Sequence, residues 1–227
     1  MHEEKSSVIF AENLTLSYRK NEPILKNIGL NIKTKDFVFV TGKSGSGKST
    51  FLKSLYAVLE PDVGRLNVCG IELDNITTKN RNFLRKHLGV VFQDYKLIDN
   101  WTIEKNVMLP LFIAGFSKEV CLSQAHKLLK HVKLLHKADK YPPELSGGEQ
   151  QRAAVARALA HNPVLILADE PTGNLDDYSS GVIWDLLKGA NEQLGTTIVT
   201  VTHRIPSLLR VNYRHFIIEN GGMDEVC

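Results

Sequence analysis

The sequence predicts an α/β fold with a mixed, mainly parallel sheet, an antiparallel β subdomain at the N-terminus and an inserted α-helical subdomain. Residues 8–32 alternate between apolar and polar side chains with a period of two, which is typical of antiparallel strands. FVFV at 37–40 is a continuous apolar run, as in a strand buried on both faces, and it leads into a glycine-rich turn and a helix. Residues 102–161 hold no convincing strand and place apolar side chains at helical spacing.

The first half of the chain is expected to form the antiparallel strands and the start of the parallel sheet. Residues 8–32 should fold around a turn at Asn21 to Pro23. The helix after the glycine-rich turn is expected to end at EPDVG, and its apolar face carries Phe51, Leu52, Leu55, Tyr56 and Leu59. Residues 65–75 are expected to form another strand with its turn, and residues 88–92 (LGVVF) a buried strand.

The second half of the chain is expected to be helical first and then to return to the parallel sheet. Helical spacing after about Lys96 is clearest at Ala125, Leu128, Leu129, Val132 and Leu135. The elements expected after that are a buried strand at 164–169 (VLILAD), a helix at 181–195 closed by Gly195, a strand at 196–203, and a hairpin around Asn220 and Gly221.

Length, composition and charge restrict the class of protein. The 227 residues suffice for one full domain, and no internal repeat indicates a second. The net charge of +3 is small and the basic residues are spread out, so no nucleic-acid partner is expected. The widely spaced Cys69, Cys121 and Cys227 are expected to be reduced thiols. No apolar run approaches the ~20 residues that span a bilayer, and the acidic start is unlike a secretory signal, so we expect a cytosolic chain or one held at a membrane by a partner.

GKSGSGKST fulfils the complete pattern G-x-x-x-x-G-K-[ST] of a phosphate-binding loop, between a strand and a helix as that motif requires. Backbone N–H groups of such a loop face phosphate oxygens, Lys48 adds a positive charge, and the Ser49 hydroxyl can ligate Mg²⁺. The alternative is a chance glycine loop, which the flanking strand and helix disfavour. The predicted nucleotide-binding residues are therefore Gly42, Lys43, Ser44, Gly45, Ser46, Gly47, Lys48, Ser49 and Thr50.

VLILADEP places two carboxylates at the end of a buried strand. Asp169 can hold Mg²⁺ through water, and Glu170 is expected to point to the opposite side, as strand geometry requires. A carboxylate beside the γ-phosphate can orient or deprotonate the attacking water. The alternative is an acidic pair exposed to solvent, which the phosphate-binding loop makes the weaker interpretation.

LSGGEQQ at 145–151 has the features of a helix start that holds an anion. Ser146 and Glu149 have the S-x-x-E spacing of a capping box, so a well-capped structural helix is the simpler interpretation. That interpretation does not explain Gly147 and Gly148, because glycine in the first helical turn costs stability. Glycine is useful where another group approaches the backbone closely, and a phosphate is the natural candidate.

Together the motifs resemble the ABC ATPase family in order and approximate spacing: GKSGSGKST, Gln93 in VVFQD, LSGGEQQ, LILADEP, NLDD at 174–177 and His203 in TVTHR. The resemblance covers nearly the whole chain as one cassette. It implies a RecA-like and β-rich core over about 1–95 and 162–227, and a helical subdomain over about 96–161. It also implies ATP as ligand with Mg²⁺. It further implies a homodimer in which LSGGEQQ, the signature segment of one subunit, contacts the ATP bound by the other.

The resemblance further implies roles for individual residues. Lys48, Gln93, Glu170 and His203 would be catalytic, with Gln93 also at the Mg²⁺ beside Ser49 and Asp169. His203 would hydrogen-bond the γ-phosphate and Glu170. Tyr18 would stack on adenine, although a core aromatic next to Leu14 and Leu16 is the alternative. The residues implied to reach the nucleotide of the other subunit are Ser146, Gly147, Gly148, Glu149 and Asp176.

Within the family, residues 83–117 and ADEPTGNLDD most resemble the FtsE-type group of bacterial cell-division ATPases. That group implies an FtsX-like integral membrane partner, a peripheral position on the cytoplasmic face of the bacterial cell membrane, and signalling to cell-wall hydrolases. A LolD-type or MacB-type ATPase for lipoprotein release or export is the alternative, and a DNA- or ribosome-acting ABC ATPase is a third. Trp101 and Arg204 depart from the pattern and are given no role.

Overall fold

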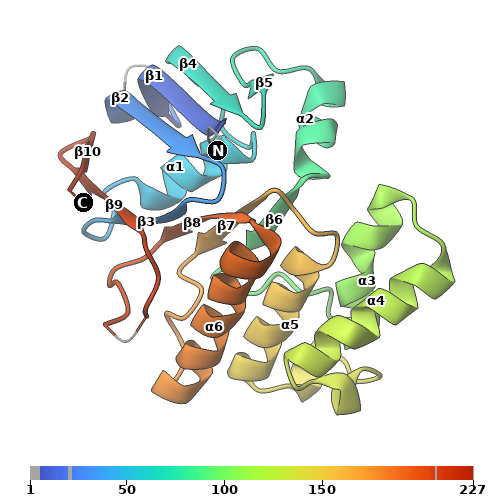
Figure 1. Ribbon diagram of the computed structural model, residues 1–227. Helices are drawn as coiled ribbons and strands as arrows, with labels where there is room; N and C mark the ends of the chain where they lie inside the picture. The colour runs from blue at the N-terminus through green and yellow to red at the C-terminus, as the bar shows by residue number, and fades with distance from the viewer. Residues whose placement is uncertain (1–5, 20–21, 208, 227) are drawn as a thin grey trace, which may run out of the picture.

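The computed structural model describes residues 6–19, 22–207 and 209–226, and contains two sheets joined by helices (Figure 1). A four-stranded sheet has the order β2-β1-β4-β5, and a six-stranded sheet has the order β10-β9-β3-β8-β7-β6. The predicted α/β class, with an antiparallel sheet and a mixed sheet, is confirmed.

The four-stranded sheet is antiparallel throughout. Its members are β1 (Ser7–Ser17), β2 (Pro23–Lys33), β4 (Val63–Val68) and β5 (Ile71–Glu72). The predicted turn between β1 and β2 includes Asn21, which lies outside the described residues. The alternating side chains of β1 and β2 put one face of this sheet into the core that covers helix α1 (Lys48–Leu55).

The six-stranded sheet is parallel except at one edge. The parallel strands are β3 (Phe37–Thr41), β6 (Leu88–Val91), β7 (Leu165–Asp169), β8 (Thr197–Val201) and β9 (Arg214–Glu219). Strand β10 (Gly222–Glu225) pairs antiparallel with β9 and completes the predicted hairpin. Asn220 and Gly221 have φ values of 49° and 79°, the left-handed pair that a tight hairpin turn needs.

Two helical boundaries and one additional helix differ from the sequence-based expectation. Helix α1 ends at Leu55, because Ala57 adopts a left-handed φ of 55°; Leu59 packs against the core from beyond the helix. Helix α2 (Thr78–Arg85) was not expected, since Leu84 is its one buried residue and leaves no apolar periodicity. Helix α6 (Asp177–Leu194) begins four residues earlier than expected, and Gly181 lies inside it.

Three further helices pack together around an apolar cluster of their own. They are α3 (Ile103–Ala114), α4 (Lys118–His131) and α5 (Gly147–Leu159), with short 3₁₀ turns at Leu135–Lys137 and Pro142–Glu144. In Figure 1, α3 and α4 lie beside α5 and apart from the four-stranded sheet. Helix α5 also contacts β6 and α6, so it connects this helical group to the six-stranded sheet.

Two of the three cysteines lie in the described part of the chain. Cys69 and Cys121 are free, and burial raises the pKa of the Cys69 thiol to about 11, which leaves little reactive thiolate near neutral pH. Cys227 lies outside the described residues. None of the helices that the structure describes has both the length and the apolar character needed to cross a bilayer.

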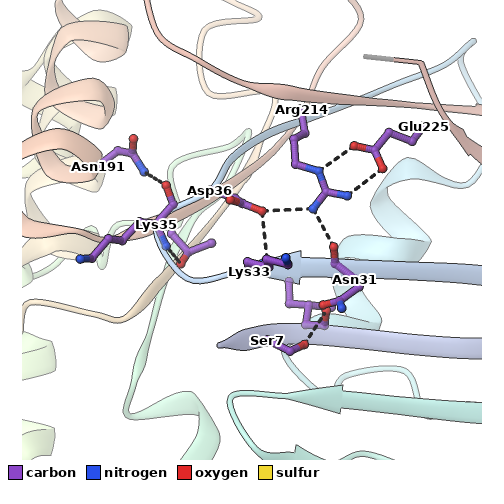
Figure 2. A network of polar contacts seen from close by, with 10 residues as sticks. Ser7, Asn31, Lys33, Lys35, Asp36, Asn191, Arg214 and Glu225 are labelled. Carbon is purple, nitrogen blue, oxygen red and sulfur yellow. Dashed lines mark hydrogen bonds and ion pairs between the residues drawn. The ribbon is translucent and has the colours of Figure 1, made fainter. Parts of the chain in front are cut away.

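A polar network fastens the C-terminal hairpin to the turn between β2 and β3 (Figure 2). The Arg214 guanidinium donates to both carboxylate oxygens of Glu225, at 2.6 and 2.7 Å, and to Asp36 at 3.1 Å. It also donates to the Asn31 carbonyl oxygen on β2 at 2.6 Å. The Arg214 guanidinium therefore connects β9 of the six-stranded sheet to β2 of the four-stranded sheet.

Acidification is expected to destabilise the wild-type chain more than a Glu225→Gln variant. Hydrogen bonding from Arg214 holds the pKa of the Glu225 carboxyl below its ordinary value of 4.5. This stabilisation is present above that ordinary value and is lost as the pH falls through the lowered pKa. Because Glu225 is 41% exposed, we expect the acid-induced loss in the free energy of unfolding to differ between the two proteins by about 1 kcal/mol at most. Urea unfolding at neutral pH and at about pH 3 measures it; equal pH effects in both proteins would contradict the expectation.

Candidate functional site

The carboxyl ends of β3, β8 and β7 lie side by side, because these parallel strands are neighbours in the six-stranded sheet. The loop at 42–47 follows β3, Asp169 ends β7 with Glu170 directly after it, and Thr202 and His203 follow β8. Segments far apart in the sequence are thereby brought to one edge, where ligands of open α/β sheets usually bind.

The phosphate-binding loop is packed so closely that glycine is needed at two places. A Cβ on Gly42 would lie 2.5 Å from the Ile218 carbonyl oxygen. Gly47 has a φ of 108°, and a Cβ there would lie 2.8 Å from Leu25 Cδ2. The loop is therefore seated on β9 on one side and on the start of β2 on the other.

The interior of this loop fits a chain of phosphates. Lys48 is 7% exposed, and its ammonium donates to the carbonyl oxygens of Gly42, at 2.8 Å, and Lys43, at 3.1 Å. Gly47 provides no side-chain cap for α1, so the first N–H groups of that helix are available to an anion. Ser46 Oγ is buried without a hydrogen-bond partner in the described part of the chain. These donors match the acceptors of a nucleotide triphosphate.

Asp169 and Ser49 lie together beside the loop. The Ser49 hydroxyl donates to Asp169 Oδ1 at 3.4 Å. Burial raises the pKa of the Asp169 carboxyl, the hydrogen bond from Ser49 lowers it, and the charge of Glu170 raises it further. A divalent cation here would favour the ionised carboxylate, and Mg²⁺ commonly takes one or two protein oxygens plus phosphate oxygens. The two side chains therefore fit Mg²⁺.

Glu170 points into the site for a different reason from the one expected. Its φ is 44°, so the strand ends at Asp169 and a left-handed residue, rather than strand alternation, directs the side chain. The carboxylate is 9% exposed and accepts a hydrogen bond from Thr202 Oγ1 at 3.1 Å. His203 Nε2 lies 3.3 Å from the other carboxylate oxygen. The structure therefore brings His203 close to Glu170 but does not form the predicted hydrogen bond, because this carboxylate oxygen has no hydrogen-bond partner among the described residues.

Tyr18 and Gln93 flank the site from two other elements. Tyr18 follows β1 and is 53% exposed, which rules out the core alternative; its hydroxyl accepts a hydrogen bond from Lys53 on α1 at 3.2 Å. Gln93 is exposed and follows β6, the strand next to β7. Their contacts with a nucleotide stay predictions.

The signature segment forms the predicted capping box at the start of α5. Glu149 N donates to Ser146 Oγ at 3.4 Å, and Ser146 N donates to the Glu149 carboxylate at 2.9 Å. The other Glu149 oxygen accepts from Lys137 Nζ at 2.6 Å, which is the main reason that the pKa of Glu149 is lowered. Within its own chain Glu149 is thus engaged by the helix cap and by Lys137.

Asp176 caps α6 in a similar way. Its carboxylate accepts from the Ser179 backbone N–H at 2.9 Å and from the Ser179 hydroxyl at 2.7 Å. These bonds hold its pKa below the ordinary value. A role for Asp176 at the nucleotide of another subunit stays a prediction.

Sequence reasoning missed three residues that shape the site. Thr202 supports Glu170, as described above. Gln151 on α5 donates to the Pro171 carbonyl oxygen at 2.7 Å, directly after Glu170. Arg157 on α5 donates to the carbonyl oxygens of Tyr95 and Lys96 in the loop after Gln93. The available signal was polarity: Gln151 and Arg157 are long polar residues in an Ala-rich helix, and both are buried.

Comparison with known proteins gives a consistent result. The family model described as "ABC transporter" matches residues 25–173. The cell division ATP-binding protein FtsE of Streptococcus pneumoniae is 40% identical over 215 residues, covering 95% of this chain and 93% of that protein. The lipoprotein-releasing system ATP-binding protein LolD of Wigglesworthia glossinidia brevipalpis is 39% identical over 216 residues, covering 93% and 94%.

A solved structure also matches the fold. The dimeric, post-hydrolysis ATP-binding cassette MJ0796, bound to ADP and Pi, has a TM-score of 0.86 and 37% sequence identity. The match covers 96% of this chain and 98% of that chain.

Proposed function

Because the chain belongs to the ABC transporter family and is its ATP-binding, ATP-hydrolysing cassette, we propose that it powers an FtsE-type complex in bacterial cell division. In this proposal two copies dimerise around ATP, and their closure drives a conformational signal through an FtsX-like membrane protein to cell-wall hydrolases. The chain is then peripheral, on the cytoplasmic face of the bacterial cell membrane.

The observation that carries the catalytic part of the proposal is the placement of Glu170. Its carboxylate accepts a hydrogen bond from Thr202 and lies beside His203, at the sheet edge that also carries Lys48 and the pair Ser49 and Asp169. A carboxylate in that position can accept the proton of a water that attacks the γ-phosphate.

The other side chains of the site have separate roles in ATP hydrolysis. Lys48 and the N–H groups at the start of α1 bind the phosphates and stabilise charge that develops during transfer. Ser49 and Asp169 would hold Mg²⁺, with Gln93 as a further ligand, and the bound ion would supply positive charge beside the phosphate oxygens. His203 is assigned to the γ-phosphate in this proposal, which its 58% exposure and its distance of 3.3 Å from Glu170 support.

A second copy of the chain completes each site in the proposal. The similarity to MJ0796 supports dimerisation, because the MJ0796 cassette is dimeric in its structure with ADP and Pi. In that arrangement Ser146, Gly147, Gly148, Glu149 and Asp176 of one subunit approach the nucleotide held by the other. Tyr18 stacks on adenine from the same chain as the phosphate-binding loop.

A cleft beside α3 supports attachment to a membrane protein. It has a volume of about 430 Å³ and lies between the strand β6 and the helices α3 and α5. Apolar side chains dominate its lining, and Val58 and Ile113 in it are 57% and 51% exposed. Such an apolar surface is suited to an apolar segment of a partner.

The similarity to LolD makes a lipoprotein-release complex the second candidate function.

Depletion of the chain in its source organism is expected to produce filamentous cells if the cell-division proposal holds.

A tagged wild-type chain should recover an integral membrane protein from detergent extracts, whereas Ile113→Asp, which places a charge in the cleft, should not. Leu194→Asp is the matched control, because Leu194 is 60% exposed at the end of α6 and does not line the cleft. Normal division together with mislocalised lipoproteins would favour the LolD-type function instead.

A further inference from the structure

Each glycine of the signature pair makes room for a side chain of the same subunit. A Cβ on Gly147 would lie 2.9 Å from the Tyr95 hydroxyl, and a Cβ on Gly148 would lie 3.0 Å from Ser179 Oγ. The first distance is below any ordinary contact of a Cβ atom, and the second is unusually tight. Each glycine therefore lies against a side chain of its own subunit, which would have to shift to admit a Cβ atom.

Tyr95 belongs to the loop that follows Gln93, and this loop has an unusual backbone. Tyr95 and Lys96 are consecutive residues with φ values of 61° and 49°, both in the left-handed region. Such conformations cost energy for residues other than glycine and persist when the surroundings fix them. The Tyr95 and Lys96 amides are satisfied locally by Phe92 O, at 3.1 Å, and Asp94 O, at 2.6 Å.

Helix α5 supplies the surroundings that fix this loop. The Arg157 guanidinium donates to the carbonyl oxygen of Tyr95 at 2.7 Å and to that of Lys96. Arg157 is 8% exposed, and burial lowers its pKa to about 10. Ten residues earlier on the same helix, the missing side chain of Gly147 leaves room for the hydroxyl end of Tyr95. One helix thus bonds the Tyr95 backbone through Arg157 and leaves room for the tip of its ring at Gly147.

We propose that Tyr95 is a positioning residue that makes the loop after Gln93 and the signature glycines move as one unit. The proposal rests on the proposed function, in which Gln93 serves the nucleotide of its own chain and Gly147 serves the nucleotide of the other. A displacement of Gln93 by a bound γ-phosphate then shifts Tyr95, and the ring transfers that shift to Gly147. The two nucleotide sites of the dimer are connected through each subunit by this contact.

Gly147→Ala provides the test, because the added methyl group displaces the Tyr95 hydroxyl. In the nucleotide-free chain we expect amide hydrogen exchange of residues 93–97 to become at least about threefold faster. Tyr95→Phe removes the hydroxyl, and the next ring atom lies 3.9 Å from the Cβ position, an ordinary contact. The double variant should therefore return to wild-type exchange.

Gly148→Ala is the matched control. Its methyl group meets Ser179 rather than Tyr95, so residues 93–97 should exchange at the wild-type rate and Tyr95→Phe should change nothing further. Unchanged exchange of residues 93–97 in Gly147→Ala would overturn the contact on which the proposal depends.

ATPase kinetics test the positioning role. We expect Gly147→Ala to lower kcat at least about tenfold, with KM within about twofold of wild type, and Tyr95→Phe to restore most of the loss. A purely structural lesion would instead lower the amount of folded enzyme and leave kcat per folded molecule unchanged. Restored exchange without restored kcat would overturn the role while leaving the ATPase and cell-division assignments untouched, because these are tested at Glu170 and by depletion.

Discussion

Glu170→Gln is expected to lower kcat for ATP hydrolysis by about 10²- to 10⁴-fold, the usual contribution of a positioned general base. Glutamine keeps the shape of glutamate, and Thr202 can still donate to its amide oxygen, so the local structure should persist. The amide cannot accept the proton of the attacking water. ATP binding should therefore remain, and an ATP-bound dimer should accumulate.

Steady-state phosphate release measures the loss, and size-exclusion chromatography with ATP measures the dimer. Glu192→Gln is the matched control, because Glu192 is an exposed residue of α6 that pairs with Lys188. Turnover of Glu170→Gln within a factor of a few of wild type would contradict the assigned role.

Lys48→Met is expected to weaken ATP binding by about 10- to 150-fold, which corresponds to the ~1.5–3 kcal/mol of a hydrogen bond to a charged group. Methionine matches the length of lysine but offers no charge to the phosphates, and it leaves the Gly42 and Lys43 carbonyl oxygens without their donor. Equilibrium titration with a fluorescent ATP analogue measures the change. Lys79→Met on α2 is the charge-matched control, and equal affinities of both variants would contradict the loop assignment.

Mixed dimers extend this prediction to the second subunit. With Lys48→Met on one chain and Ser146→Arg on the other, both lesions fall in the same composite site, and the second site stays intact. With both lesions on one chain, each site is damaged once. The first dimer should therefore retain roughly half of the wild-type turnover and the second almost none. The reverse order of activities would mean that each chain holds a complete site.

The parallel strands and the phosphate-binding loop could be predicted because local pattern determines them. Continuous apolar runs identify β3 and β7, β-branched residues identify β8, and the order of these strands in the sheet brings their ends together. The pair Asp169 and Glu170 was found for the same reason, since it directly ends such a run.

What could not be predicted depends on contacts between distant segments. Helix α2 has a polar composition and is recognisable in sequence only by its Thr77 cap. The direction of Glu170 depends on a left-handed φ that sequence alternation does not reveal. The sequence suggested that a phosphate approaches Gly147 and Gly148, and the structure adds Tyr95 and Ser179, which are remote along the chain. Periodicity carries no information on such pairs.

The position of β3 in the sheet has a consequence for how the chain is made. Its hydrogen-bonding partners on both sides, β8 and β9, come from the last part of the sequence. During synthesis, the strand that precedes the phosphate-binding loop therefore leaves the ribosome well before its partners, and both of its edges stay unpaired until β8 and β9 have emerged. Long-range parallel pairing of this kind forms slowly. The surface on which the phosphate-binding loop is seated is therefore complete only after β8 and β9 have joined β3 in the sheet.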